Sequence, residues 1–122
     1  MPHKATIDLV TYDPKRDAYV LGVVETGDGS AGCLGRLQER LYDYVDIAVD
    51  GHLAQQYPES RGKSVVIRLD CYDSPREACE QFFSRFAEHI HSSGEIQAAI
   101  RKHGHIKDID FEFSWRTLTG AA

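Results

Sequence analysis

The most recognisable chemical pattern in this sequence is a glycine-rich stretch at residues 27–32. Gly27, Gly29 and Gly32 have the spacing G-x-G-x-x-G between a predicted strand and a predicted helix. Backbone amides in such a loop, together with the positive end of the helix dipole, can bind a phosphate group. A dinucleotide fold, however, needs a second strand with an acidic residue about 20 residues further on, where this sequence predicts helix. The context therefore favours a turn, with phosphate binding as the alternative.

His52 is the second candidate, because an imidazole can exchange protons near neutral pH. It falls on the apolar stripe of a predicted helix, where Asp50 or Tyr42 could orient it as a buried base. No serine or cysteine nucleophile is linked to it by a recognisable motif. A structural histidine that complements the dipole at the end of the helix is the competing interpretation.

Asp70 belongs to a group of carboxylates on two predicted strands, which also contains Asp108, Asp110 and Glu112. Carboxylates on adjacent strands can bind a divalent cation or act as an acid and base pair. Such a site requires Asp70 and Asp110 to be neighbours across the two strands. A pair of strands that turn their polar side to water explains the same pattern without a ligand.

Thiol and imidazole side chains are zinc ligands, but their spacing here does not predict a metal site. Neither a C-x-x-C nor an H-x-x-x-H pair occurs, and we predict no metal and no cofactor. The three cysteines are an odd number and two lie on predicted core faces, which indicates free thiols in a reducing compartment. The side chains considered are Cys33, Cys71, Cys79, His89, His91, His103 and His105.

Strands and helices must position these side chains, and hydrophobic periodicity predicts where they lie. The first helix begins near residue 33 and ends before Tyr57-Pro58, because proline cannot donate a backbone hydrogen bond. Ser74 is the predicted N-cap of the second helix, with Pro75 at its first position. The predicted strands are residues 5–12, 18–25, 63–72 and 108–115, and the predicted helices are residues 34–56, 75–91 and 95–102.

The order of the long elements is strand, strand, helix, strand, helix, strand, which is typical of an α+β fold. Right-handed crossovers place both long helices on one face of a four-stranded mixed sheet. We predict a single domain over residues 1–122, with an ordered core over residues 4–116. The predicted core contains Val65, Ile67, Leu69, Phe82, Phe83, Phe86, Phe111 and Phe113.

Charge and hydropathy argue against several classes of function. The net charge of −5 supplies no cluster of Lys and Arg for nucleic acid or for an anionic membrane. No apolar run reaches the roughly 20 residues that a membrane-spanning helix needs, and the first residues do not have the pattern of a signal peptide. We therefore expect a cytoplasmic protein that binds neither nucleic acid nor membrane.

The central part of the sequence has a recurring set of features. A helix ends in glycine, and a short polar run, Tyr-Pro, a small-residue turn, an alternating strand and a helix that starts with proline follow. The residues that carry these features are Gly51, Tyr57, Pro58, Gly62, Lys63, Val65, Ile67 and Pro75. In this block, residues 34–90, the chain resembles a family of small bacterial proteins known as a domain of unknown function. The resemblance implies a small α+β fold and a bacterial cytoplasmic setting, and it brings no catalytic residues.

The exposed side of the predicted sheet suggests an interface. Val66, Arg68, Tyr72 and Tyr12 are predicted to lie there, where apolar and aromatic groups interrupt acidic ones. Such a patch favours binding of another protein or formation of a weak homodimer. The functional hypothesis is a non-enzymatic protein-binding, accessory or regulatory domain. The alternative is a small enzyme or phosphate-binding protein that uses the loop at residues 27–32 with His52 or Asp70.

Overall fold

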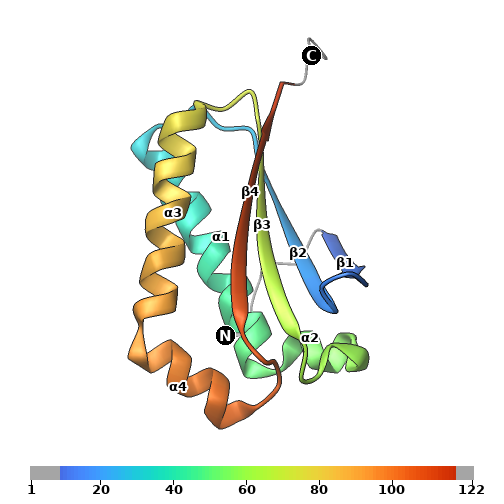
Figure 1. Cartoon of the computed structure of the whole chain (residues 1–122). Coiled ribbons are helices and arrows are strands. Elements are labelled where there is room, and N and C mark those ends of the chain that lie inside the picture. The colour runs from blue at the N-terminus through green and yellow to red at the C-terminus, as the bar shows by residue number, and fades with distance from the viewer. Residues whose placement is uncertain (1–8, 118–122) are drawn as a thin grey trace.

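One mixed sheet, with its four strands in chain order, organises the computed structural model of the protein (Figure 1). The strands are β1 (Leu9–Asp13), β2 (Ala18–Glu25), β3 (Ser64–Tyr72) and β4 (Ile109–Arg116). β1 and β2 form an antiparallel hairpin, whereas β3 runs parallel to both β2 and β4. The structure describes residues 9–117, so the part of the predicted first strand at residues 5–8 lies outside the described residues.

Two long helices connect the parallel strands and lie on one side of the sheet (Figure 1). The helices are α1 (Ala31–Asp50), α2 (His52–Gln56), the 3-10 turn η1 (Pro58–Ser60), α3 (Arg76–Ser92) and α4 (Gly94–His103). The predicted α+β fold, with two long helices on one face of a mixed four-stranded sheet, is therefore confirmed. The short elements α2 and η1 are additions to the predicted order, and α4 corresponds to the predicted third helix.

The core forms where the helices meet the central strand. The inward row of β3 consists of Val65, Ile67, Leu69 and Cys71, all with no exposed surface. α1 covers this row with Leu37, Leu41, Tyr44, Val45 and Ala48, and α3 covers it with Cys79, Phe83, Phe86 and Ile90. The alternation predicted for β3 is thus correct.

Gly51 divides the helix predicted over residues 34–56 into α1 and α2. Its φ of +101° lies in the left-handed region, which glycine adopts without strain. A Cβ atom at this position would also lie 2.8 Å from Nε2 of His105. The prediction of one continuous helix is therefore wrong at this residue, although Leu53 and Ala54 beyond it remain buried.

The start of α3 also differs from the prediction. Ser74 is not its N-cap: the side chain is buried, and its hydroxyl donates to the backbone carbonyl of Glu25 at 3.3 Å. The carbonyl of Pro75 instead accepts the first helical bond, from the amide of Cys79. Ser74 therefore ties the end of β2 to the β3–α3 connection.

The antiparallel pairing of the hairpin reverses the predicted facing of β1. Tyr12 lies opposite Tyr19, which faces the helix side of the sheet. Residues directly opposite each other in an antiparallel pair point to the same face. Tyr12 therefore lies on the other side of the sheet from Val66 and Tyr72, and our prediction that these residues share one face is wrong.

The turn between β1 and β2 sets this register. Asp13 pairs with Ala18, and its Oδ1 accepts hydrogen bonds from the amides of Lys15 and Arg16 at 3.0 and 3.4 Å. Asp17 closes the turn at a φ of +50°, a conformation that aspartate tolerates better than most residues. The length of the turn determines which β1 side chains face inward.

No helix within residues 9–117 combines the length and the apolar character that crossing a membrane requires.

The structure distinguishes the phenylalanines that the sequence placed together in the core. Phe83→Ala should lower the free energy of unfolding by about 3 to 5 kcal/mol. Its buried ring lies 5.8 Å from that of Phe111 and 6.3 Å from that of Phe113, between centroids. Phe82→Ala should cost clearly less, because that side chain is only partly buried. Urea denaturation of both variants measures the difference, and equal losses would contradict this view of the core.

Candidate functional site

The glycine-rich loop is held by its own side chains. The amide of Gly27 donates to Oε2 of Glu25 at 2.6 Å, and the amide of Ser30 donates to Oδ1 of Asp28 at 2.9 Å. Ser30 is the N-cap of α1, and its hydroxyl accepts from the amide of Cys33 at 3.3 Å. These side-chain oxygens occupy amide donors that a phosphate would need, so the loop closes on itself as a turn.

The negative charge of Asp28 and the close packing around Gly29 also favour a turn over a phosphate site. Hydrogen bonds from Ser30 and Cys33 lower the pKa of Asp28 to about 2, so a fixed negative charge lies beside the start of α1. Gly29 has a φ of +76°, and a Cβ atom there would lie 2.9 Å from the ring of Pro75. Gly32 lies in the first turn of α1. Turn geometry and close packing therefore account for Gly27 and Gly29 without a ligand.

His52 lies at the start of α2 and is not buried. Half of its side chain is exposed, and its Nδ1 lies 3.0 Å from Oδ1 of Asp50. The predicted contact with Asp50 is present, but the predicted position on a buried stripe is wrong, because Gly51 turns the chain before His52.

Asp70 and Asp110 are not neighbours in the sheet. The parallel register of β3 and β4 pairs Asp70 with Ser114, and Asp110 with Val66. The condition for a shared carboxylate site is thus not met. Asp70 instead accepts a hydrogen bond from Nε of Arg68 at 3.0 Å. This ion pair between two residues of the same strand gives the carboxylate a structural role.

The predicted interface residues do not form one exposed patch. Val66 is buried with Ala18 and Val20 in a small cluster on the sheet face away from the helices. Arg68 and Tyr72 lie on this face and are half-buried, whereas Tyr12 lies on the other face.

Two of the three thiols are buried in the core. Burial and the neighbouring thiol of Cys79 raise the pKa of Cys71 to about 12, and burial also raises the pKa of Cys79. Both are therefore protonated and weakly nucleophilic near neutral pH. Within residues 9–117, no three His, Cys, Asp or Glu side chains gather closely enough to hold a metal ion.

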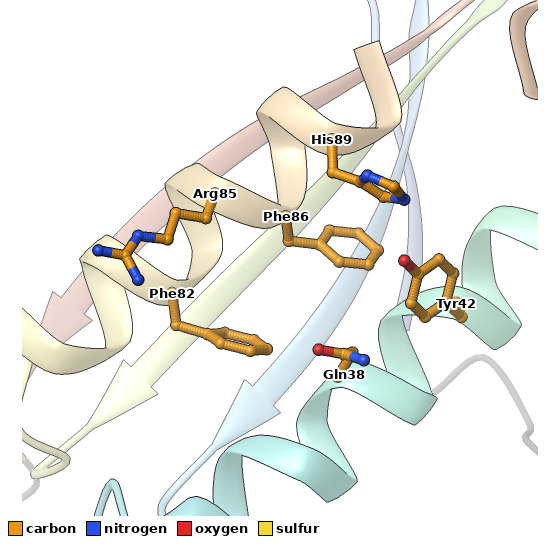
Figure 2. A pocket seen from close by; sticks show the side chains of 6 residues that line it. All are labelled: Gln38, Tyr42, Phe82, Arg85, Phe86 and His89. Atoms are coloured by element: carbon orange, nitrogen blue, oxygen red, sulfur yellow. The ribbon is translucent and has the colours of Figure 1, made fainter. Parts of the chain in front are cut away.

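A groove between α1 and α3 is a concave feature of the described surface. It has a volume of about 270 Å³ and is lined by Gln38, Tyr42, Phe82, Arg85, Phe86 and His89. Figure 2 shows the rings of Tyr42, Phe82 and Phe86 between the two helices, with the α3 residues spaced one helical turn apart. The rings of Tyr42 and Phe86 contact each other edge to face, with their centroids 5.0 Å apart.

The rim of the groove is polar. Arg85, His89 and Gln38 are exposed around the aromatic floor, and the ring of His89 lies 6.4 Å from that of Tyr42. No acidic residue within 9–117 forms an ion pair with Arg85. The groove thus combines an apolar floor with a cationic edge, which suits a ligand that has both apolar and anionic groups.

Sequence reasoning did not identify this groove. The available signal was the width of the α3 stripe, because Phe82, Phe83 and Phe86 cannot all point directly at the sheet. Phe82 lies on the flank toward α1, where Tyr42 covers Phe86.

The comparison with known families gives a clear match. A family model matches residues 1–103 of the chain, which include β1 to α4 and exclude β4. The chain belongs to the DUF6572 family. This family is described as one of unknown function, so the predicted resemblance is confirmed and extends beyond residues 34–90. No curated protein and no solved structure matches the chain.

The pKa of Asp28 leads to a prediction about pH. The folded state holds this pKa near 2, below the ordinary value of 3.8, so ionised Asp28 stabilises the protein above pH 3.8, and this stabilisation is lost as the pH falls through about 2. Asp28→Asn should therefore destabilise the DUF6572 chain at neutral pH, and the difference should shrink toward pH 2. Urea midpoints across this range measure it. Asp108→Asn is the control, and a pH-independent difference for Asp28→Asn would contradict a stabilising role of the ionised Asp28 carboxylate.

The unequal burial of the three thiols leads to a prediction about their reactivity. A thiol reagent at neutral pH should label Cys33 in the folded protein, because only this cysteine is partly exposed. Labelling of Cys71 and Cys79 should require unfolding. Mass spectrometry of labelled peptides measures the order, and Cys33→Ser should remove the native-state reaction. Rapid labelling of Cys71 in folded protein would contradict its burial.

Proposed function

We propose that this DUF6572 protein is a non-enzymatic protein-binding domain with an accessory or regulatory role. Its partner would insert a short amphipathic segment, with apolar side chains and at least one carboxylate, into the groove between α1 and α3. The single observation that carries the proposal is the aromatic floor beside the exposed guanidinium of Arg85.

The floor supports an apolar anchor. Phe82 is only partly buried, and Phe86 contacts Tyr42 of the other helix, so aromatic surface remains between α1 and α3. Amphipathic segments bind such grooves through side chains spaced one helical turn apart. Water displaced from these rings by an aliphatic side chain would supply the driving force.

The rim supports an anionic group on the partner. The chain has a net charge of −5, so acidic partners are repelled over much of its surface and attracted only at local cations. Arg85 is such a cation, and a guanidinium can bind a carboxylate through two parallel hydrogen bonds. The pairing would fix the direction in which the segment enters.

The size of the groove favours a side chain over a whole cofactor. Its volume of about 270 Å³ is below the roughly 300 to 1,000 Å³ of most small-molecule sites. The alternative function, catalysis or phosphate binding at residues 27–32, has less support because that loop bonds to its own side chains and lies at the opposite end of α1 from His52.

Selection from a displayed library of random peptides tests the proposal. Peptides enriched on the immobilised wild-type chain should share apolar residues about one helical turn apart and an acidic residue. Arg85→Glu should weaken their binding by roughly tenfold or more, because it replaces attraction with repulsion and each factor of ten is about 1.4 kcal/mol. Phe82→Ala should weaken it similarly, while the fold is retained. Fluorescence anisotropy with a labelled peptide measures both.

Arg101→Glu is the matched control, because it reverses an exposed arginine on α4, outside the groove. Binding to this variant should be unchanged apart from a small general effect of net charge. Enriched peptides that bind the Phe82→Ala and Arg85→Glu variants as well as the wild type would refute the groove as the binding site. The same library can be selected on the immobilised Arg85→Glu variant. If the wild type enriches no peptides beyond those that this variant enriches, the groove is also refuted as the binding site.

A further inference from the structure

The outer edge of β4 is an unpaired strand edge within the described chain. β4 lies at the end of the sheet and, among residues 9–117, pairs with β3 alone. The amide of Val65 donates to the carbonyl of Asp108, and the amide of Asp73 donates to that of Arg116. Because backbone groups alternate in direction along a strand, the even-numbered residues of β4 bond to β3. The odd-numbered residues therefore present their amides and carbonyls to the outside.

One end of this edge is closed by a side chain. Nε2 of His91 lies 2.9 Å from the carbonyl of Ile109, the first outward group of β4. Its ring also packs against that of Phe111, with centroids 5.3 Å apart. The open section of the edge therefore consists of the outward backbone groups of Phe111, Phe113 and Trp115.

β4 carries the charged residues Asp110, Glu112 and Arg116, but it lacks two of the devices that most strongly prevent strands from pairing at an edge. Proteins commonly protect long edges with proline, lysine or a bulge. Residues 109–116, IDFEFSWR, contain no proline, lysine or glycine. The opposite edge strand, β1, is described over only five residues. Within residues 9–117, the edge of β4 is thus open over residues 111–115 for pairing with another strand.

We propose that β4 pairs with β4 of a second copy of this chain, antiparallel and about a two-fold axis at Phe113. In this register Phe111 lies opposite Trp115 of the other copy, so each open outward residue finds a partner. On the face away from the helices, Asp110 then lies opposite Arg116. Both side chains are exposed, Asp110 by 74%, and Oδ1 of Asp110 also lies 3.6 Å from Nε2 of His91 at its own edge of the sheet. The edge is therefore complementary to itself in both hydrogen bonding and charge.

Charge also disfavours the neighbouring registers. An axis at Phe111 would place Asp110 opposite Glu112, and an axis at Glu112 would place that carboxylate opposite its own copy. Both arrangements set like charges against each other. An axis at Ser114 pairs Glu112 with Arg116, but it moves Phe111 beyond the end of the partner strand. The axis at Phe113 alone joins opposite charges and uses the whole open edge.

A charge-swap cycle tests this interface. Asp110 and Arg116 are six residues apart on one strand, about 20 Å, so they do not interact within one copy and any coupling reports on a contact between copies. Arg116→Glu and Asp110→Arg should each weaken dimerisation roughly tenfold, because each change places like charges opposite each other at two symmetric points. The double variant should restore it. Sedimentation equilibrium over a wide concentration range measures the dissociation constant.

Hydrogen exchange supplies an independent measurement. Amides of Phe111, Phe113 and Trp115 should exchange more slowly as the concentration rises, whereas the amide of Glu112, which bonds to β3, should be protected at every concentration. A monomer of 13.7 kDa at all concentrations, with fast exchange of the outward amides, would overturn the proposal. Rescue of Arg116→Glu by Glu112→Arg instead of Asp110→Arg would overturn the register.

Discussion

The parallel pairing of β3 with both of its neighbours is the constraint on which the rest of the structure depends. A parallel pair cannot be joined by a tight turn, so each connection must cross over the sheet. Right-handed crossovers from β2 to β3 and from β3 to β4 place α1 and α3 on the same face. The fully buried inward row of β3 is the surface on which both helices pack.

This one-sided arrangement creates both surfaces proposed to bind other molecules. Two helices that lie side by side on a sheet contact it with only part of their circumference, and the flanks that they turn toward each other enclose a groove. Phe82 fills that position on α3, and Tyr42 faces it from α1. The same topology adds strands in one direction only, so that β4 is an edge strand of the sheet within residues 9–117.

The local patterns of the sequence were sufficient where one face of an element is buried. The alternating pattern of β3 predicted its element and its buried row correctly. Patterns failed where tertiary geometry decides between equivalent local choices. Alternation in β1 is compatible with either facing, and the register of the hairpin selects the one that turns Tyr12 toward Tyr19.

The same reasoning explains the other errors. His52 fits the helical period of α1, but periodicity carries no information about a glycine that adopts a positive φ just before it. Asp70 and Asp110 lie on adjacent strands, but the register pairs Asp70 with Ser114, four residues beyond Asp110, and periodicity does not reveal the register. The groove was missed because two helices line it. The periodicity of one helix does not reveal how that helix is placed relative to another.

α3 lies between the two proposed surfaces and contributes to both. Its flank toward α1 carries Phe82 and Arg85, whereas its other flank reaches β4, where Arg76 stacks over the ring of Trp115 at 5.9 Å. A segment bound in the groove would therefore leave the edge of β4 uncovered. Two copies joined through β4 would hold their grooves in a fixed geometry on one side of a continuous sheet. A partner with two suitable segments would then bind the second at a high effective concentration, which compensates for the small area of each groove.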